Sequence, residues 1–91
     1  MKKHIVISGR VQGVGFRYWL QSRAVKKNIF GWVKNKITGE VEALIIGHEK
    51  EVKDVLKLCK QGPSSSRVDH VEINEYSNDY SNKSFNIIKS D

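Results

Sequence analysis

The chain has 91 residues, with 16 Lys and Arg against 10 Asp and Glu, and a formal net charge of +6. This length excludes a second domain and allows one modest core, which buries roughly 60 to 65% of the unfolded surface. The single cysteine excludes an internal disulfide, and the apolar run from Ile5 to Ile7 is too short for a signal peptide or a membrane span, so we expect a cytoplasmic protein with one domain over residues 1–91.

The basic residues are concentrated in the first part of the chain. Residues 1–39 contain nine Lys and Arg and no acidic residue, whereas all ten acidic residues lie from Glu40 onward. A positive field of this kind attracts anionic ligands. Charge alone is equally compatible with a basic surface that only keeps the protein in solution.

The first predicted elements are a strand and a helix. Isoleucines at alternate positions predict a strand over Lys3–Ser8 with one buried face. Apolar residues that recur every four positions from Phe16 predict a helix to about Lys27. Asn28 follows and can end this helix in the left-handed conformation.

A hairpin is predicted after this helix. Two β-rich runs, 29–36 and 40–46, are separated by Ile37-Thr38-Gly39, a spacing that suits a tight turn. In the first run, Val33 and Asn35 fall on the same face.

The rest of the chain predicts a second helix, a strand and a short β segment. Apolar side chains at helical spacing predict the helix over 49–60, which Gly62-Pro63 ends: Val52, Val55, Leu56 and Cys59. Alternation predicts a strand over 68–75, and a second alternating segment covers 84–89. The order βαββαβ predicts an α+β fold, a ferredoxin-like sandwich in which two helices cover one face of an antiparallel sheet.

The connection between the first strand and the first helix predicts an anion-binding site. Residues 9–17, Gly-Arg-Val-Gln-Gly-Val-Gly-Phe-Arg, contain three glycines and end in an arginine. Glycine adopts the dihedrals that point successive backbone N–H groups into one concavity, and the start of the helix adds its own unpaired N–H groups. Arg17 opposes the helix dipole, at a cost of a few tenths to about 1 kcal/mol, unless an anion binds there. The glycine spacing fits neither the ATP-binding nor the dinucleotide-binding fingerprint.

The other polar residues give weaker signals. Asn35 is either a turn former or, because its amide both donates and accepts, a residue that holds a water beside a bound phosphate.

The three histidines, at positions 4, 48 and 70, show no metal-ligand spacing, so no metal site is predicted. Cys59 is expected in the core. Residues 40–46 contain no aromatic side chain, which disfavours an RNA-recognition sheet.

On these motifs the chain resembles the acylphosphatase family over nearly its full length. Besides residues 9–17, the matching segments are Gly31-Trp32-Val33-Lys34-Asn35, Gly39-Glu40-Val41-Glu42, Gly62-Pro63 with Val68 and Val71, and Phe85-Asn86-Ile87. In that family the loop backbone and its arginine bind the substrate phosphate, and the asparagine positions the attacking water. The resemblance therefore implies phosphate binding by Gln12, Gly13, Val14, Gly15, Phe16 and Arg17, and catalysis by Arg17 and Asn35.

The implied reaction is hydrolysis of carboxyl-phosphate mixed anhydrides to a carboxylate and phosphate, by a monomer without metal or other cofactor. The leaving carboxylate has a conjugate acid of pKa roughly 4, so it departs at neutral pH without protonation. A site made from a segment without Asp or Glu therefore suits this chemistry. No general base is identified, and we hypothesise that a phosphate oxygen of the substrate takes the proton of the water.

Two positions depart from the family pattern, and two alternatives remain open. Asn28 stands where the family usually has glycine, and Ile37-Thr38-Gly39 replaces the usual Asp-Gly turn, which could shift Asn35. One alternative is a non-catalytic basic module of the same fold that binds nucleic acid or an acidic partner. The other is a physiological substrate other than an acyl phosphate, as in related domains of larger carbamoyl-transfer proteins.

Overall fold

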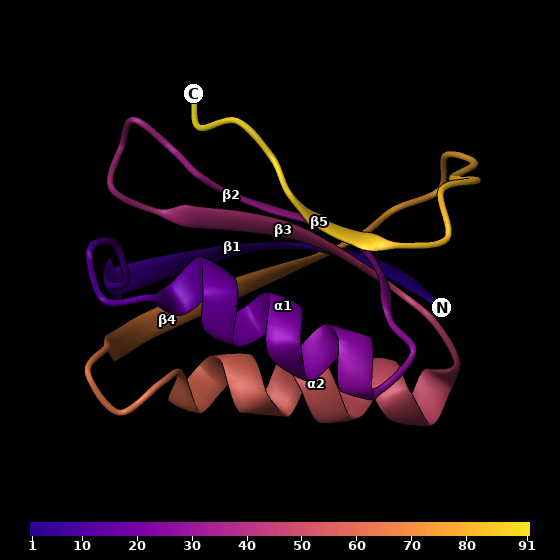
Figure 1. Ribbon diagram of the computed structural model, residues 1–91, viewed down its shortest axis with the longest axis horizontal. Coiled ribbons are helices and arrows are strands. Elements are labelled where there is room, and N and C mark those ends of the chain that lie inside the picture. The colour runs from indigo at the N-terminus through magenta and orange to yellow at the C-terminus, as the bar shows by residue number, and fades with distance from the viewer.

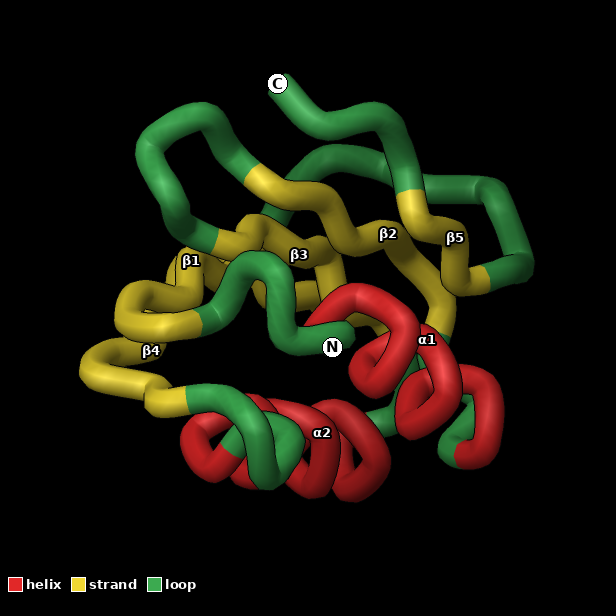
Figure 2. Tube along the Cα trace, turned by 60° about the vertical axis from the view of Figure 1, so that its left-hand side comes forward, coloured by secondary structure: helices red, strands yellow, loops and turns green.

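In the computed structural model, which describes residues 1–91, two helices cover one face of a five-stranded sheet (Figure 1). The strands are β1 (Lys2–Arg10), β2 (Phe30–Asn35), β3 (Val41–Ile46), β4 (Arg67–Glu75) and β5 (Phe85–Ile87), in the order β4-β1-β3-β2-β5. The helices, α1 (Phe16–Lys26) and α2 (Glu49–Gln61), lie beside each other below the sheet (Figure 2). The predicted ferredoxin-like sandwich is confirmed.

The sheet is mixed, and the prediction that it is antiparallel throughout is wrong at one edge. The β1–β3, β1–β4 and β2–β3 pairs are antiparallel, but β5 pairs in parallel with β2. Since β4 runs opposite to β1, it finishes at the end of the sheet where β2 begins. The chain returns from that end, so β5 runs in the same direction as β2 (Figure 1).

The core lies between the sheet and the helices, as the apolar patterns predict. Both helices end one residue from their predicted positions, and Asn28 adopts the predicted left-handed conformation with φ 55°. The helices bury Phe16, Leu20, Ala24, Val52, Val55, Leu56 and Cys59. The sheet adds side chains that include Ile5, Ile7, Val33, Val41, Ala43 and Ile45. Neither helix is long and apolar enough to cross a membrane.

β1 continues past its predicted end and takes Gly9 and Arg10 into the sheet. The register shifts between Ser8 and Gly9, and φ at Gly9 is 129°. A Cβ atom at this position would overlap the backbone carbonyl of Arg67 in β4. Gly9 is therefore required by the close approach of β4, and the connecting loop itself covers only residues 11–15.

The ends of β1 and β2 lie together. Both strands run antiparallel to β3, so they share a direction and finish at the same end of the sheet. Ile7 and Asn35 pair with Val41 from its two sides, and two strand spacings separate them by about 10 Å. The β1–α1 loop, the β2–β3 turn and the α2–β4 loop all lie at this end, on the left in Figure 1.

Candidate active site

The loop between β1 and α1 forms a cradle of unpaired backbone donors. Gly13 and Gly15 have φ of 72° and 77°, the left-handed values for which glycine is suited. No backbone N–H from Gln12 to Tyr18 donates to another backbone carbonyl. Consecutive free N–H groups that lead into a helix N-terminus are a ready phosphate site.

The predicted phosphate-binding residues can use mainly their backbone. The ring of Phe16 is in the core, 1% exposed, and packs edge-on against Trp19. The carbonyl of Val14 accepts a hydrogen bond of 3.0 Å from the Ser65 hydroxyl. Because a trans peptide points its C=O and N–H in opposite directions, this bond directs the N–H of Gly15 away from Ser65. No local sequence pattern predicts this contact, because its two residues are 51 positions apart.

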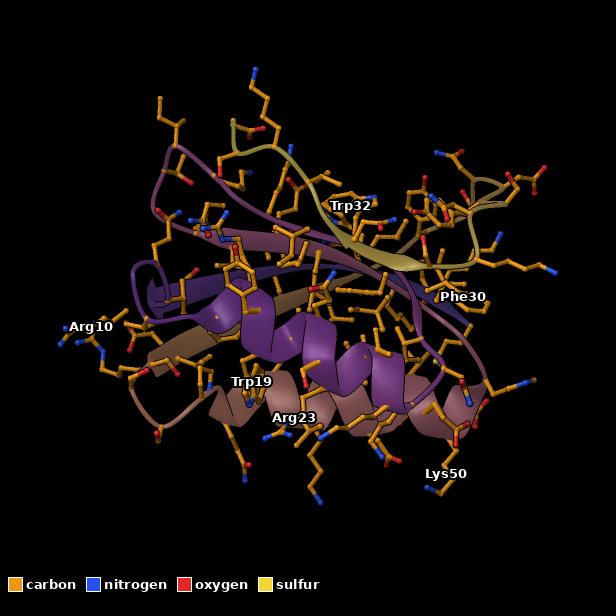
Figure 3. The ribbon with its side chains drawn as sticks, viewed as in Figure 1. Arg10, Trp19, Arg23, Phe30, Trp32 and Lys50 are labelled. Carbon is orange, nitrogen blue, oxygen red and sulfur yellow. The ribbon has the colours of Figure 1, made fainter.

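Arg17 lies in the first turn of α1, as predicted; its side chain is half-buried, and no acidic side chain pairs with it. Two more cations at this end of the sheet, Arg10 and Lys36, also lack an acidic partner, whereas Lys27 and Lys34 are paired with Asp54, Glu42 and Asp91. Arg10 extends away from the molecule at the end of β1 (Figure 3). The fold thus leaves positive charge free around the cradle.

Asn35 is the last residue of β2, on the helix-covered face with Val33. Its Oδ1 atom is buried and has no hydrogen-bond partner. An unsatisfied buried acceptor costs about 1–3 kcal/mol, and such a group in a native protein calls for an explanation, of which a catalytic role or a bound water is one. The backbone around it is well held, because its carbonyl accepts the Asp91 N–H at 3.2 Å and β3 pairs on the other side.

The side-chain amide of Gln12 is not a free donor for the cradle, because it is hydrogen-bonded elsewhere. Its Nε2 atom donates to the carbonyls of Lys36 at 2.7 Å and Glu40 at 2.8 Å. These two residues flank the turn between β2 and β3. Gln12 therefore joins the loop to the segment that follows Asn35, a contact that the sequence pattern did not indicate.

The remaining features are outside this site. None of the four hollows in the molecular surface is lined by a residue of 9–17 or by Asn35. No three His, Cys, Asp or Glu side chains gather in a way that could hold a metal ion. Cys59 is fully buried, which confirms the predicted core residue, and this burial raises the pKa of its thiol to about 12, which disfavours a role as a nucleophile.

Comparisons with known proteins identify the family and the fold. Residues 3–87 match the acylphosphatase family model. A curated acylphosphatase from Nitrobacter hamburgensis is 50% identical over 70 residues, which cover 77% of this chain and 71% of that protein. The crystal structure of acylphosphatase from Bacillus subtilis matches with a TM-score of 0.92 and 36% identity, over 97% of this chain and 98% of that one.

A larger protein contains a similar unit. Full-length HypF, solved in a phosphate- and nucleotide-bound form, matches with a TM-score of 0.89 and 33% identity over 98% of this chain, which spans 12% of the HypF chain. With the loop, the arginine and the asparagine assembled at one end of the sheet, and with the family model matched over residues 3–87, the chain belongs to the acylphosphatase family.

Proposed function

We propose that this chain hydrolyses acyl phosphates at the cradle, with the phosphoryl group bound by the backbone of residues 12–17 and by Arg17, and with the attacking water held by Asn35. The observation that carries the proposal is the buried, unpartnered Oδ1 of Asn35. It lies at the end of the sheet where the loop leaves its N–H groups free. An acceptor and a set of donors are thus available on the two sides of one small site.

The cradle supplies charge stabilisation. The free N–H groups and the positive end of the α1 dipole attract the phosphoryl oxygens. The guanidinium of Arg17 can contact two of these oxygens at once. In a loose phosphoryl-transfer transition state the charge spreads over the equatorial oxygens, so preorganised donors around them lower the barrier.

Asn35 supplies orientation. Its Oδ1 accepts one hydrogen of the water, which turns a lone pair of the water oxygen towards phosphorus. A new P–O bond then forms as the bond from phosphorus to the acyl oxygen breaks, and the carboxylate leaves with the bonding electrons. The proton of the water passes to a phosphoryl oxygen. Holding the water in line replaces a bimolecular encounter with an intramolecular one.

No step of this scheme uses a metal, and we propose a metal-independent monomer. The carboxylate, whose conjugate acid has a pKa of roughly 4, needs no Lewis acid or proton donor to leave. The one cysteine, Cys59, is buried and unpaired, which suits a reducing compartment such as the cytoplasm.

The test is phosphate release from benzoyl phosphate. We expect Arg17→Ala and Asn35→Ala each to lower kcat/KM by about 10² or more, the scale of losing one preorganised electrostatic contact. Arg23→Ala is the matched control, because Arg23 is on the same helix, stacks on Trp19 at 5.7 Å and has no acidic partner. It should keep wild-type activity, and so should the wild type in excess EDTA.

Each part of the proposed function has a result that would contradict it. Full activity in Asn35→Ala would remove its assigned role, and loss of activity in EDTA would refute metal independence. A wild type that releases no phosphate but binds RNA in a salt-sensitive way would replace hydrolysis with the binding-module alternative.

A further inference from the structure

The two halves of the proposed site come from strands that do not touch. The cradle follows β1 and Asn35 ends β2, with β3 between them. Backbone hydrogen bonds of the sheet hold the strands themselves in register. Beyond the ends of the strands, the loop and the turn are free to move unless another contact joins them.

Gln12 provides such a contact. Its amide group carries two hydrogens, and both are used, on the carbonyls of Lys36 and Glu40. The same two carbonyls close the turn, because Gly39 N–H donates to Lys36 at 3.1 Å and Lys36 N–H donates to Glu40 at 2.8 Å. Gln12 therefore completes the hydrogen bonding of the turn from the loop side, directly beside Asn35.

We propose that Gln12 is a positioning residue, which fixes the distance between the phosphate cradle and Asn35 by tying the loop to the β2–β3 turn. This inference rests on the proposed function, since it explains how its two parts are kept in register. The backbone N–H of Gln12 belongs to the cradle. Its side chain acts through Asn35 and touches neither substrate nor water.

This role requires a long side chain with two donors. An asparagine is one methylene shorter, and a glutamate would present acceptors to two carbonyl oxygens. Methionine keeps the length and the apolar stem of glutamine but donates nothing. Gln12→Met therefore removes the tie with little change in volume and no change in charge near the cradle.

Gln21→Met is the matched control. Gln21 is also half-buried, and its Nε2 donates to a backbone carbonyl, that of Phe85, at 3.0 Å. That bond joins α1 to β5 and does not involve the β1–α1 loop or the β2–β3 turn. Both substitutions lose amide-to-carbonyl bonds, so a purely structural effect should appear in both variants.

We expect Gln12→Met to lower kcat for benzoyl phosphate by roughly 10- to 100-fold, because a displacement of about 1 Å at a reacting group costs up to 10²-fold. The inhibition constant of inorganic phosphate should change less than about 3-fold, because the donors of the cradle remain. Gln21→Met should change neither value. In an Asn35→Ala background, Gln12→Met should have little further effect on kcat, since residues that act as a unit are not additive.

If the wild type is active, any one of three results would overturn the proposal that Gln12 is a positioning residue. They are an unchanged kcat in Gln12→Met, a weaker phosphate affinity with kcat intact, and an equal loss of kcat in the presence and absence of Asn35. If Gln12→Met does not fold, Gln12→Asn, which keeps the amide but cannot span the gap, is judged by the same results. A wild type without hydrolysis would refute the proposed function itself, and this proposal with it.

Discussion

Asn35 is placed where function and stability make opposite demands. The fold buries the Oδ1 atom of its side chain and gives it no partner, although a buried acceptor of this kind costs about 1–3 kcal/mol. Its neighbour on the same face, Val33, is fully buried in the core and contributes to stability in the ordinary way. Active-site residues often carry strain or unsatisfied polarity that a stability optimum would remove.

Asn35→Ala should therefore abolish most activity without destabilising the protein. We expect its free energy of unfolding, measured by urea denaturation, to lie within about 1 kcal/mol of the wild type or above it, because no hydrogen bond is lost. Val33→Ala should lose about 2 kcal/mol through lost burial and the cavity that remains. A loss of more than about 2 kcal/mol in Asn35→Ala would show that the amide stabilises the fold and argue against an orphaned acceptor.

At the scale of the elements, three connections lie at one end of the sheet, and side-chain hydrogen bonds join the β1–α1 loop to the other two. The β1–α1 loop receives a hydrogen bond from the α2–β4 loop through Ser65 and gives two to the β2–β3 turn through Gln12. Shortly before the loop, β1 bulges against β4 between Ser8 and Gly9. Gly9, before the loop, and Gly13, within it, are therefore needed for different reasons. Substitution of each by alanine can distinguish these reasons.

Gly9→Ala should destabilise the protein far more than Gly13→Ala. An alanine at Gly9 would overlap the Arg67 carbonyl, so β1 and β4 must separate, and we expect a loss above about 3 kcal/mol. Around Gly13 there is open space, and only the left-handed backbone opposes alanine, at about 1–2 kcal/mol. Thermal unfolding of both variants tests this order, and similar losses would contradict a steric role for Gly9.

The sequence predicted the elements better than it predicted their contacts. Apolar spacing within one segment determines its period and buried face, so both helices, the hairpin and the faces of Val33 and Asn35 were predictable. The direction of β5 was not, since it depends on which end of the sheet the chain returns from. The side-chain bonds of Gln12 were not either, because their acceptors lie 24 and 28 positions further along the chain.

At the scale of the whole molecule, folding redistributes the charge asymmetry of the chain. Acidic residues of the later segments pair with Lys3, Lys27 and Lys34 of the basic segment. The cations that remain unpaired include Arg10, Arg17 and Lys36, around the cradle. Part of the positive charge that composition assigns to the N-terminal segment thus stays unneutralised around the proposed phosphate site, where it favours anion binding.

Binding at this site should be detectable in the stability of the entire fold, with Cys59 as the probe. Cys59 is fully buried in the core between α2 and the sheet, and burial raises its pKa to about 12. Alkylation at pH 8 therefore requires the structure to open, since the thiolate is the nucleophile. When closing is faster than alkylation, the labelling rate follows the population of the open form.

Inorganic phosphate at about 100 times its dissociation constant should stabilise the native state by about 2.7 kcal/mol and slow the alkylation of Cys59 about 100-fold. Potassium chloride at the same ionic strength should give little protection, because the cradle is expected to recognise a tetrahedral anion and not charge alone. Arg17→Ala should lose most of the protection by phosphate, since the loop alone lacks the bidentate contact. Equal protection by chloride, or protection that survives in Arg17→Ala, would place the bound anion elsewhere on the basic surface and separate phosphate binding from the residues assigned to catalysis.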